Sequence, residues 1–321
     1  MRALVTGAAG FIGAHVVDAL VAAGAEVRAF DRDAPADLPA GAEAVIGDLL
    51  DAEAVRAAMD GCDAVFHLAA VYSFARSDAG LMQAVNVEGS RILLDTAARA
   101  PVRPRVVYTS SCATCGPVRG RPATEDDAPP AYELAVPYKR TKIEGEQLAL
   151  AAAAEGHDVV VVNPTTPIGP GDRRPTPTGK MIADVARGRA RGYLAGSVLN
   201  IVAVQDVAAG HVGAHERGRA GRRYLLGGEN LPMREVFATA ARAAGRPAPR
   251  LAVPWPVAYG AALAARVALR PFGREPELLV LDEVRLGRLP MAFDDARARR
   301  ELGHTSMPGC DAIEAAVRTL V

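Results

Sequence analysis

Three glycines at regular spacing follow the first apolar segment of the chain. Residues 2–6 read RALVT, and Gly7, Gly10 and Gly13 follow them in GAAGFIG, at the start of an alanine-rich stretch. Glycine at every third position allows a tight turn from strand to helix, a close backbone approach to a pyrophosphate, and tight packing of the helix on the strand. Because the chain indicates a strand before this turn and a helix after it, we expect a dinucleotide-binding turn rather than an ordinary one.

The first two thirds of the chain alternate short aliphatic segments with longer alanine-rich segments. This alternation is typical of βαβ units around a parallel sheet, and the uninterrupted apolar segments indicate strands that are buried on both faces. We therefore predict an α/β fold with a doubly wound parallel sheet of the Rossmann type. The predicted strands are 2–6, 26–31, 44–47, 64–68, 105–109, 159–163, 199–204 and 223–226, and the predicted helices include 14–23 and 90–98.

A proline- and glycine-rich segment, NPTTPIGPGDRRPTPTG, begins at Asn163. Its composition excludes regular helix and predicts a long loop. We assign residues 1–163 to the core of a dinucleotide-binding domain, to which later segments return, and residues 164–321 mainly to a smaller substrate-binding lobe. Since the loop follows a strand end at the carboxyl edge of the sheet, we expect residues 165–179 to close over the substrate, with 180–191 as the other wall.

Charge and composition narrow the class of partner. Lysine plus arginine and aspartate plus glutamate both number 37 among the 321 residues, so no electrostatic argument favours nucleic acid or an anionic membrane surface. We expect a small-molecule substrate, and a homodimer stays open as the assembly beside a monomer. The N-terminal residues lack the pattern of a secretory signal, which predicts a cytoplasmic protein.

The apolar segment 257–269 raises the question of membrane contact, because Arg266 is its only charged residue. The segment is shorter than the roughly 20 residues that span a bilayer, so we predict no integral membrane helix. A buried or pocket-lining helix is the favoured interpretation, and peripheral contact with a lipid surface is the alternative.

Two of the four cysteines, Cys112 and Cys115, form a Cys-x-x-Cys pattern. Redox or zinc chemistry is the functional interpretation of such a pair. The chain has no second cysteine pair at zinc spacing, so we predict that both thiols serve packing and that the protein holds no metal.

Acidic and small residues follow the next predicted strands. Asp31 ends the second strand, where a carboxylate can accept hydrogen bonds from the adenosine ribose and repel a 2′-phosphate, so we predict NAD rather than NADP. Arg32 beside it is the alternative, since it would pair with a 2′-phosphate if it turned inward. Asp48 after the third strand can bond the adenine amino group, and the small residues of 67–70 let the backbone approach the cofactor.

A tyrosine and a lysine lie four residues apart at Tyr138 and Lys142, a spacing that places both on one face of a helix. A phenol with a pKa of about 10 is a poor base at neutral pH unless a nearby positive charge stabilises the phenolate, and Lys142 supplies that charge. Ser111 follows the fifth strand, where its hydroxyl can hold a substrate oxygen. Thr109 and Ser110 are the alternatives to Ser111, and capping of the strand end is the non-catalytic role open to these hydroxyls.

These motifs together resemble the extended short-chain dehydrogenase/reductases of the NAD-dependent epimerase/dehydratase family, over nearly the whole chain. The resemblance implies that Asn86, in the sequence NVEG, contacts the cofactor and that Ser111, Tyr138 and Lys142 are the catalytic residues. The predicted NAD contacts are Gly7, Gly10, Phe11, Ile12, Gly13, Asp31, Arg32, Asp48, Leu49, Leu68, Ala69, Ala70, Asn86, Thr109, Tyr138, Lys142 and Pro164. The predicted substrate contacts are Tyr72, Ser111, Cys112, Asn163, Thr178 and Met181.

Within the family, the segments 163–179 and 227–230 look most like the hopanoid-associated sugar epimerases. One departure bears on the substrate. Established nucleotide-sugar epimerases carry an arginine that grips the diphosphate beside one strand, whereas this chain reads LNIVAVQDVA at 199–208. There, and in its apolar C-terminal segment, the chain looks closer to dihydroflavonol reductases and 3β-hydroxysteroid dehydrogenases.

The resemblance leaves three functional hypotheses. The leading one is an NAD-dependent sugar epimerase or oxidoreductase, with a nucleotide sugar as the expected substrate, acting on a secondary alcohol or ketone. The alternative is a reductase or dehydrogenase of the dihydroflavonol or steroid type with a less polar substrate. The third is a cofactor-sensing regulator on the same fold, against which the intact set of Ser111, Tyr138 and Lys142 argues. An epimerase retains its cofactor and a net reductase exchanges it, so cofactor retention distinguishes the first two.

Overall fold

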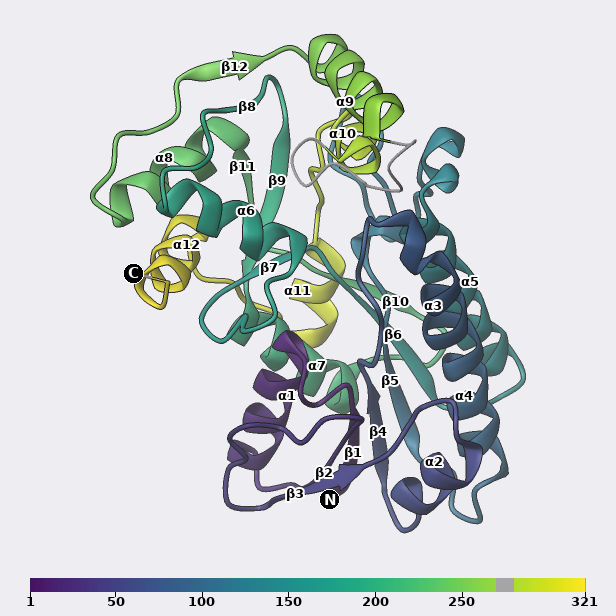
Figure 1. Ribbon diagram of the computed structural model, residues 1–321. Coiled ribbons are helices and arrows are strands. Elements are labelled where there is room, and N and C mark those ends of the chain that lie inside the picture. The colour runs from purple at the N-terminus through teal and green to yellow at the C-terminus, as the bar shows by residue number, and fades with distance from the viewer. Residues whose placement is uncertain (270–279, 321) are drawn as a thin grey trace.

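The computed structural model describes residues 1–269 and 280–320 of the chain. Its central element is a seven-stranded sheet in the order β10-β6-β5-β4-β1-β2-β3, in which every neighbouring pair of strands is parallel (Figure 1). The predicted doubly wound sheet is confirmed, and its strand order reverses between β1 and β4. The strands are β1 (Arg2–Thr6), β2 (Glu26–Asp31), β3 (Ala42–Ile46), β4 (Ala64–His67), β5 (Arg105–Thr109), β6 (Val159–Pro164) and β10 (Arg223–Leu226).

Helices cover both faces of this sheet, which explains its uninterrupted apolar strands. In β6, Val160 and Val162 join one buried cluster while Val159 and Val161 join the other, because successive side chains of a strand point to opposite faces. Each such side chain contributes about 1.5–3 kcal/mol when it is fully buried. One face is covered by α1 (Phe11–Ala22), α7 (Val204–Arg217) and α11 (Ala296–Leu302), and the other by α2 (Ala52–Met59), α4 (Ser90–Arg99) and α5 (Pro137–Ala154) (Figure 1).

The expectation of burial on both faces is wrong for β3. This strand lies at the edge of the sheet and pairs with β2 alone, and none of its residues is buried. Ile46 keeps 58% of its surface exposed. An edge strand has a neighbour on one side only, and the described helices pack mainly over the centre of the sheet, so the alanines of β3 form a strand without forming core.

A second, smaller group of elements packs beside the carboxyl ends of the strands (Figure 1). Its sheet has the order β11-β9-β7, and its buried cluster includes Ile168, Ile182, Ile201 and Phe237. The elements are β7 (Thr166–Ile168), β9 (Val198–Ala203), β11 (Glu229–Pro232), α6 (Pro177–Ala186), α8 (Met233–Ala243) and α12 (Gly309–Arg318). A further cluster joins β8 (Gly192–Leu194), β12 (Leu251–Val253), α9 (Trp255–Leu269) and α10 (Leu281–Leu286). Segments after residue 163 therefore build both groups, since α7, β10 and α11 return to the large sheet.

The predicted long loop after Asn163 is partly wrong. Its first part forms β7, and its last residues form the first turn of α6. Pro177 suits this turn because its missing N–H would have no partner inside the helix, and the Thr176 side chain accepts a hydrogen bond from the Gly179 N–H at 3.0 Å. The loop proper is reduced to residues 169–176.

The expectation of a buried helix at 257–269 is also wrong. In α9 only Ala258 and Ala262 are buried, and they form a narrow stripe against α10. Val257, Leu263 and Val267 on the same helix are exposed at 61%, 43% and 63%. Among the described residues, no helix is long and apolar enough to cross a membrane.

Helix α5 packs closely against the backbone that precedes α4 and against the Tyr108 side chain of β5. A Cβ atom at Gly145 would come within 2.8 Å of the Asn86 carbonyl oxygen and would overlap the Tyr108 hydroxyl. Asn86 belongs to η2 (Ala84–Gly89), a π-helical turn that continues into α4. Gly145 is therefore the residue that allows α5, β5 and η2 to meet.

We predict that Gly145→Ala destabilises the fold by about 1–3 kcal/mol, the usual cost of forcing an extra methyl group into a packed core. Thermal or urea unfolding of the purified protein measures this difference. Gly80→Ala is the matched control, because Gly80 is helical with open space at its Cβ position, and there alanine should be neutral or stabilising. Equal stability of the two variants would contradict the close approach of α5.

Candidate active site

The glycine turn after β1 has the geometry of a phosphate-binding site. Gly7 has a φ of +73° and sits against the backbone of Ala69 at the end of β4, where a Cβ atom would approach within 2.7 Å. A Cβ atom at Gly13 would overlap the Gly7 carbonyl group, so the turn and α1 pack without side chains between them. Gly10 precedes α1, whose N-terminus carries no side-chain cap and no acidic residue in its first turn. Uncapped N–H groups and the helix dipole suit a pyrophosphate, so these residues fit a dinucleotide.

Asp31 at the end of β2 holds this turn in place. One of its carboxylate oxygens accepts from the Ala9 N–H at 3.0 Å, and the other accepts from the Arg32 N–H at 2.7 Å. The Arg32 side chain is exposed. Each carboxylate oxygen keeps further lone pairs, so these contacts leave room for the predicted ribose hydrogen bonds.

The predicted contacts beyond β3 and β4 differ in burial. Asp48 is exposed and accepts from the Leu50 N–H at 2.9 Å, while Leu49 is buried and packs against Gly89. Leu68 and Ala69 are half-buried next to the glycine turn, and Ala70 is exposed. Pro164, the last residue of β6, is buried, and Phe11 and Ile12 are half-buried at the start of α1.

The loop 169–176 reaches back over the cofactor side of the fold. Arg173 pairs with Asp37 at 2.6 Å and Arg174 pairs with Asp33 at 2.7 Å, both in the segment between β2 and β3. His15 in α1 donates from Nε2 to the Pro170 carbonyl at 3.0 Å. We call these three contacts the loop clasp. This loop was expected at the substrate. The clasp was not predictable, because nothing in the local pattern pairs residues about 140 positions apart.

Tyr138 and Lys142 lie on successive turns of α5 and meet the end of β5. The Lys142 ammonium donates to the Thr109 carbonyl oxygen at 2.8 Å and lies 5.9 Å from the centre of the Tyr108 ring, within cation–π range. The Ser111 side chain lies near enough to the Tyr138 hydroxyl to lower the pKa of that phenol. The structure therefore brings Ser111, Tyr138 and Lys142 together as the sequence predicts, while their catalytic roles stay predictions.

Burial sets the protonation chemistry of this group. The pKa of Tyr138 is raised above its usual value because the phenol is buried, and the hydrogen bond from Ser111 opposes that rise. Burial also lowers the pKa of Lys142 to about 8, against the opposing charge of Glu146. A lysine with this pKa is mostly charged at neutral pH and gives up its proton only slightly above it.

The choice among the three hydroxyls after β5 follows from their partners. The Nδ1 of His211 donates to the Val207 carbonyl at 2.8 Å, so the Nε2 of the same ring is an acceptor. Thr109 donates its only hydroxyl proton to this Nε2 at 2.9 Å. Burial lowers the pKa of His211 to about 4, which keeps the ring neutral in this arrangement. Within the described part of the chain the Ser110 hydroxyl is buried without a partner, whereas the Ser111 side chain lowers the pKa of the Tyr138 phenol. The contacts favour Ser111.

Two aromatic rings lie beside the Tyr138 phenol. The Tyr72 ring lies 4.5 Å from the Tyr138 ring between centres, and Phe74 lies 6.0 Å from Tyr138 and 5.3 Å from Tyr72. Tyr72 is 40% exposed, and burial raises the pKa of its hydroxyl while the nearby Thr178 side chain opposes this rise. Tyr72 and Thr178, two predicted substrate contacts, thus join the loop after β4 to α6.

Asn86 fastens the loop that carries Tyr72. Its Oδ1 accepts from the Val71 N–H at 2.7 Å, and its Nδ2 donates to the Val71 carbonyl at 3.0 Å and to the Thr141 hydroxyl at 3.2 Å. Protein partners thus engage both ends of the Asn86 amide. The side chain positions Tyr72 against α5, and its predicted cofactor contact stays a prediction.

The remaining predicted substrate contacts lie deeper in the fold. Asn163 is fully buried behind the Ser111 turn, and its amide donates to the Ser111 carbonyl at 3.1 Å. Cys112 is buried with Cys115 in an apolar cluster, where burial raises the pKa of each thiol to about 12, and both cysteines are unbridged. Their burial suits the predicted packing role, and the predicted substrate contact of Cys112 stays a prediction. Met181 is half-buried in α6 against the smaller cluster.

Sequence reasoning missed several residues that shape the site. Phe74 follows Tyr72 by two positions in a segment without clear periodicity. Lys139, beside Tyr138, is fully buried, pairs with Glu133 and donates to the Gly116 carbonyl, which anchors the start of α5; lysine is so seldom buried that no pattern predicts this. Glu146 was detectable, since it continues the four-residue spacing from Tyr138 through Lys142.

Comparison with known proteins places the chain. Residues 3–227 match the NAD dependent epimerase/dehydratase family. A Synechocystis protein provisionally named dihydroflavonol 4-reductase is 39% identical over 310 residues, which is 93% of this chain and 88% of that protein. Sterol demethylase protein B of Methylococcus capsulatus is 37% identical over 307 residues, covering 94% and 93%.

A solved structure agrees with these sequence matches. The Thermus thermophilus UDP-glucose 4-epimerase, in complex with NAD, superimposes with a TM-score of 0.77 at 26% identity and covers 100% of this chain and 99% of its own. The shared fold includes the glycine turn, and the cofactor of the family is NAD. The chain therefore belongs to the NAD-dependent epimerase/dehydratase family and is an NAD-dependent enzyme of the extended short-chain dehydrogenase/reductase type.

Proposed function

We propose that the chain interconverts a secondary alcohol and a ketone on a substrate whose reacting carbon adjoins an apolar ring or chain. The aromatic group of Tyr72, Phe74 and Tyr138 carries this proposal. Aromatic rings offer a large apolar surface with few hydrogen-bonding groups. An apolar substrate gains by leaving water at such a wall, whereas a sugar would leave hydroxyl groups without partners there.

The start of β9 supports an uncharged substrate. Here Leu199 packs into the smaller cluster, and Asn200 is buried, donating to the Asn230 side chain at 2.8 Å and accepting from the Gly228 N–H at 2.8 Å. The nucleotide-sugar epimerases that the sequence resembles have a diphosphate-gripping arginine beside this strand. In this chain both positions serve internal packing, which weakens the case for a nucleotide diphosphate.

A carboxylate near the aromatic group points the same way. Glu283 in α10 adds to the raised pKa of Tyr72, after the larger effects of burial and of Tyr138. The Glu283 residue itself is exposed. A negative charge on Glu283 would disfavour an anionic substrate group beside Tyr72. The names of two relatives, a dihydroflavonol reductase and a sterol demethylase protein, are consistent with ring substrates of low charge.

The chemistry of the chain's own residues follows from their contacts. Ser111 holds the substrate oxygen beside the phenol, and Tyr138 takes up or returns the hydroxyl proton. Lys142 stabilises the phenolate form of Tyr138 by its positive charge. NAD, when bound, accepts or returns the hydride. The aromatic rings exclude water from one side of the reacting carbon.

We expect apolar ring ketones and their alcohols to be turned over, and nucleotide sugars to be turned over poorly. A panel containing flavanonols, sterols and UDP-sugars, followed by the absorbance of reduced nicotinamide, measures this. Reduced nicotinamide should form in proportion to the alcohol consumed. Preferential turnover of UDP-sugars without net change in nicotinamide absorbance would contradict the proposal.

That outcome would support a second candidate, a sugar epimerase that retains its cofactor. The loop clasp favours this candidate, because two ion pairs and one hydrogen bond hold residues 169–176 over the dinucleotide turn. Such surface pairs contribute only about 0–1 kcal/mol each, so a clasp of this kind slows cofactor exchange without preventing it. Cofactor carried through purification distinguishes the two candidates.

Tyr138→Phe should lower kcat by about 10²- to 10⁴-fold, the usual contribution of a positioned acid or base. The affinity of the variant for NAD should change little, because phenylalanine keeps the aromatic ring at position 138 and loses only the hydroxyl group. Tyr193→Phe is the control, since Tyr193 packs against Phe237 in the smaller cluster and no catalytic role is proposed for it. Steady-state kinetics and calorimetric titration with NAD separate the two effects. A kcat near that of the unaltered enzyme would require another acid or base.

The chain should bind NAD at least about tenfold more tightly than NADP, a difference of about 1.4 kcal/mol, because the Asp31 carboxylate repels a 2′-phosphate. Asp31→Asn should narrow this ratio while keeping an acceptor for the Ala9 N–H. Calorimetric titration of both variants with both dinucleotides gives the ratio. Tighter binding of NADP by the unaltered protein would instead identify Arg32 as a phosphate ligand.

A further inference from the structure

Glu146 is a buried carboxylate on the catalytic face of α5, one turn beyond Lys142. Its residue is 4% exposed. Tyr138, Lys142 and Glu146 follow one another at four-residue intervals, so all three lie along one side of the helix. A buried carboxylate is costly unless it is paired and hydrogen-bonded, so its partners reveal what it does.

Two of these partners hold the serine turn. One Glu146 oxygen accepts from the Asn163 amide at 2.6 Å and from the Thr114 hydroxyl at 2.8 Å. The same two groups lie against the Ser111 carbonyl, Asn163 at 3.1 Å and Thr114 at 2.9 Å. Thr114 has a single hydroxyl proton, which favours the charged acceptor. Glu146 thereby fixes the side chains of Asn163 and Thr114, which in turn hold the Ser111 turn in position against β6.

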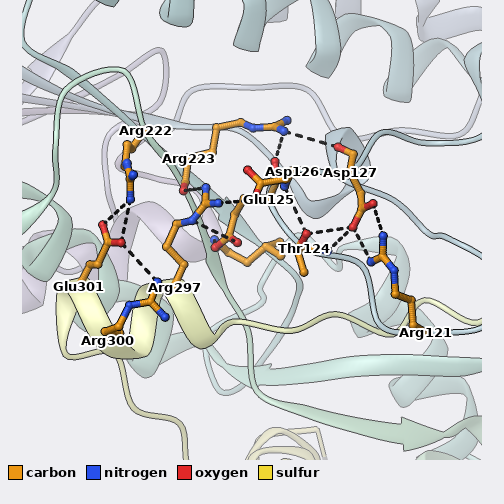
Figure 2. Close-up of polar contacts among 11 residues, drawn as sticks. Arg121, Thr124, Glu125, Asp126, Asp127, Arg222, Arg223, Arg297, Arg300 and Glu301 are labelled. Atoms are coloured by element: carbon orange, nitrogen blue, oxygen red, sulfur yellow. Dashed lines mark hydrogen bonds and ion pairs between the residues drawn. The ribbon is translucent and has the colours of Figure 1, made fainter.

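The third partner is Arg223 in β10. Its guanidinium donates to the other Glu146 oxygen at 2.9 Å, and its second amino group donates to the backbone carbonyl of Glu125. The segment that holds Glu125 is itself fixed by ion pairs of Arg297 with Asp126 and of Arg121 with Asp127, each at 2.6 Å (Figure 2). Arg223 is therefore held between β10 and this segment and cannot turn away from Glu146 without breaking both contacts.

The charges around Lys142 leave Glu146 as its counter-charge. The titratable groups that face Lys142 or Glu146 from neighbouring elements are His67 of β4, Tyr108 of β5, Cys115 and Arg223. Burial lowers the pKa of His67 to about 3, raises that of Cys115 to about 12 and raises that of Tyr108, so these three groups stay neutral. Glu146 raises the pKa of Lys142 against the effect of burial. Near neutral pH the charged set is Lys142, Glu146 and Arg223.

We propose that Glu146 is a positioning residue of the active site, which fixes the Ser111 turn through Thr114 and Asn163 and places a negative charge beside Lys142, while Arg223 sets the strength of that charge. The proposal rests on the catalytic roles of Ser111, Tyr138 and Lys142 given above. Glu146 makes no hydrogen bond to the Tyr138 phenol or to the Lys142 ammonium. It acts on them through Thr114, Asn163 and its own charge.

The first test is the pH dependence of kcat in Glu146→Gln, which keeps the shape and one acceptor but removes the charge. Without this charge Lys142 loses its proton at lower pH, so the alkaline fall of kcat should move down by about one pH unit. Glu146→Asp should restore most of the shift. Glu144→Gln is the matched control, because Glu144 lies on the same helix, is half-buried and pairs with Arg140 away from Lys142. An unmoved alkaline limb in a folded Glu146→Gln would overturn the proposal.

The second test uses Arg223→Met, which removes the positive charge that offsets Glu146. The alkaline fall of kcat should then move to higher pH, opposite to Glu146→Gln. A purely structural role would not give shifts of opposite sign. The proposal would therefore also be overturned if the alkaline fall of kcat moved in the same direction in Glu146→Gln and in Arg223→Met. Because this variant keeps Glu146 itself, it also tests the proposal if Glu146→Gln does not fold.

A third measurement does not depend on turnover. The chain has three lysines, Lys139, Lys142 and Lys180, so trace acetylation of the cofactor-free protein at several pH values reports each amine separately by peptide mass. The apparent pKa of Lys142 should fall by about one unit in Glu146→Gln, with exposed Lys180 as the internal reference. If Lys142 shifts but Tyr138→Phe remains active, the proposed function fails and Glu146 still tunes Lys142. If Tyr138→Phe is inactive and Lys142 does not shift, only the role of Glu146 fails.

Discussion

The close packing of α5 against η2 and the Tyr108 side chain is the constraint on which the active site depends. Gly145 allows the helix to approach until the Lys142 ammonium reaches the Thr109 carbonyl and lies beside the Tyr108 ring. This packing excludes water from the Lys142 ammonium, and the burial lowers its pKa to about 8. With a pKa so near neutral, the charge of Lys142 can respond to the protonation of the Tyr138 phenol. A larger residue at this position would lift the catalytic face off the sheet and return the lysine to water.

Sequence reasoning recovers the parts of this protein that are local. The sheet, the glycine turn and the spacing of Tyr138 and Lys142 each depend on residues within one βα unit or one helix, and all are present as predicted. The position of Ser111 follows because strand ends of a parallel sheet gather at one edge. Partners far apart in the chain were not predictable: Arg223 with Glu146 and Arg174 with Asp33 are joined only by the tertiary fold.

The predictions that were wrong also failed because local sequence does not reveal tertiary neighbours. Apolar periodicity reports that a segment can be buried and does not report whether a neighbour covers it, so β3 and α9 were expected to be more buried than they are. The proline-rich segment was expected to be a loop throughout. Proline is unfavourable inside a helix and favourable in its first turn, so the same residue type both ends β6 and starts α6.

The place of β10 has a consequence for how the chain assembles during synthesis. This strand pairs with β6 across about 60 intervening residues, and it brings Arg223 to the helix that carries the catalytic groups. A ribosome that has released only the first 163 residues has made every proposed catalytic side chain, but the edge of β6 still lacks β10 and the carboxylate of Glu146 still lacks Arg223. Contacts of such long sequence separation form late, because the loop must first be closed. The nascent enzyme therefore carries its catalytic groups well before it can hold them in order, and maturation of the site waits for the strand that arrives last in the sheet.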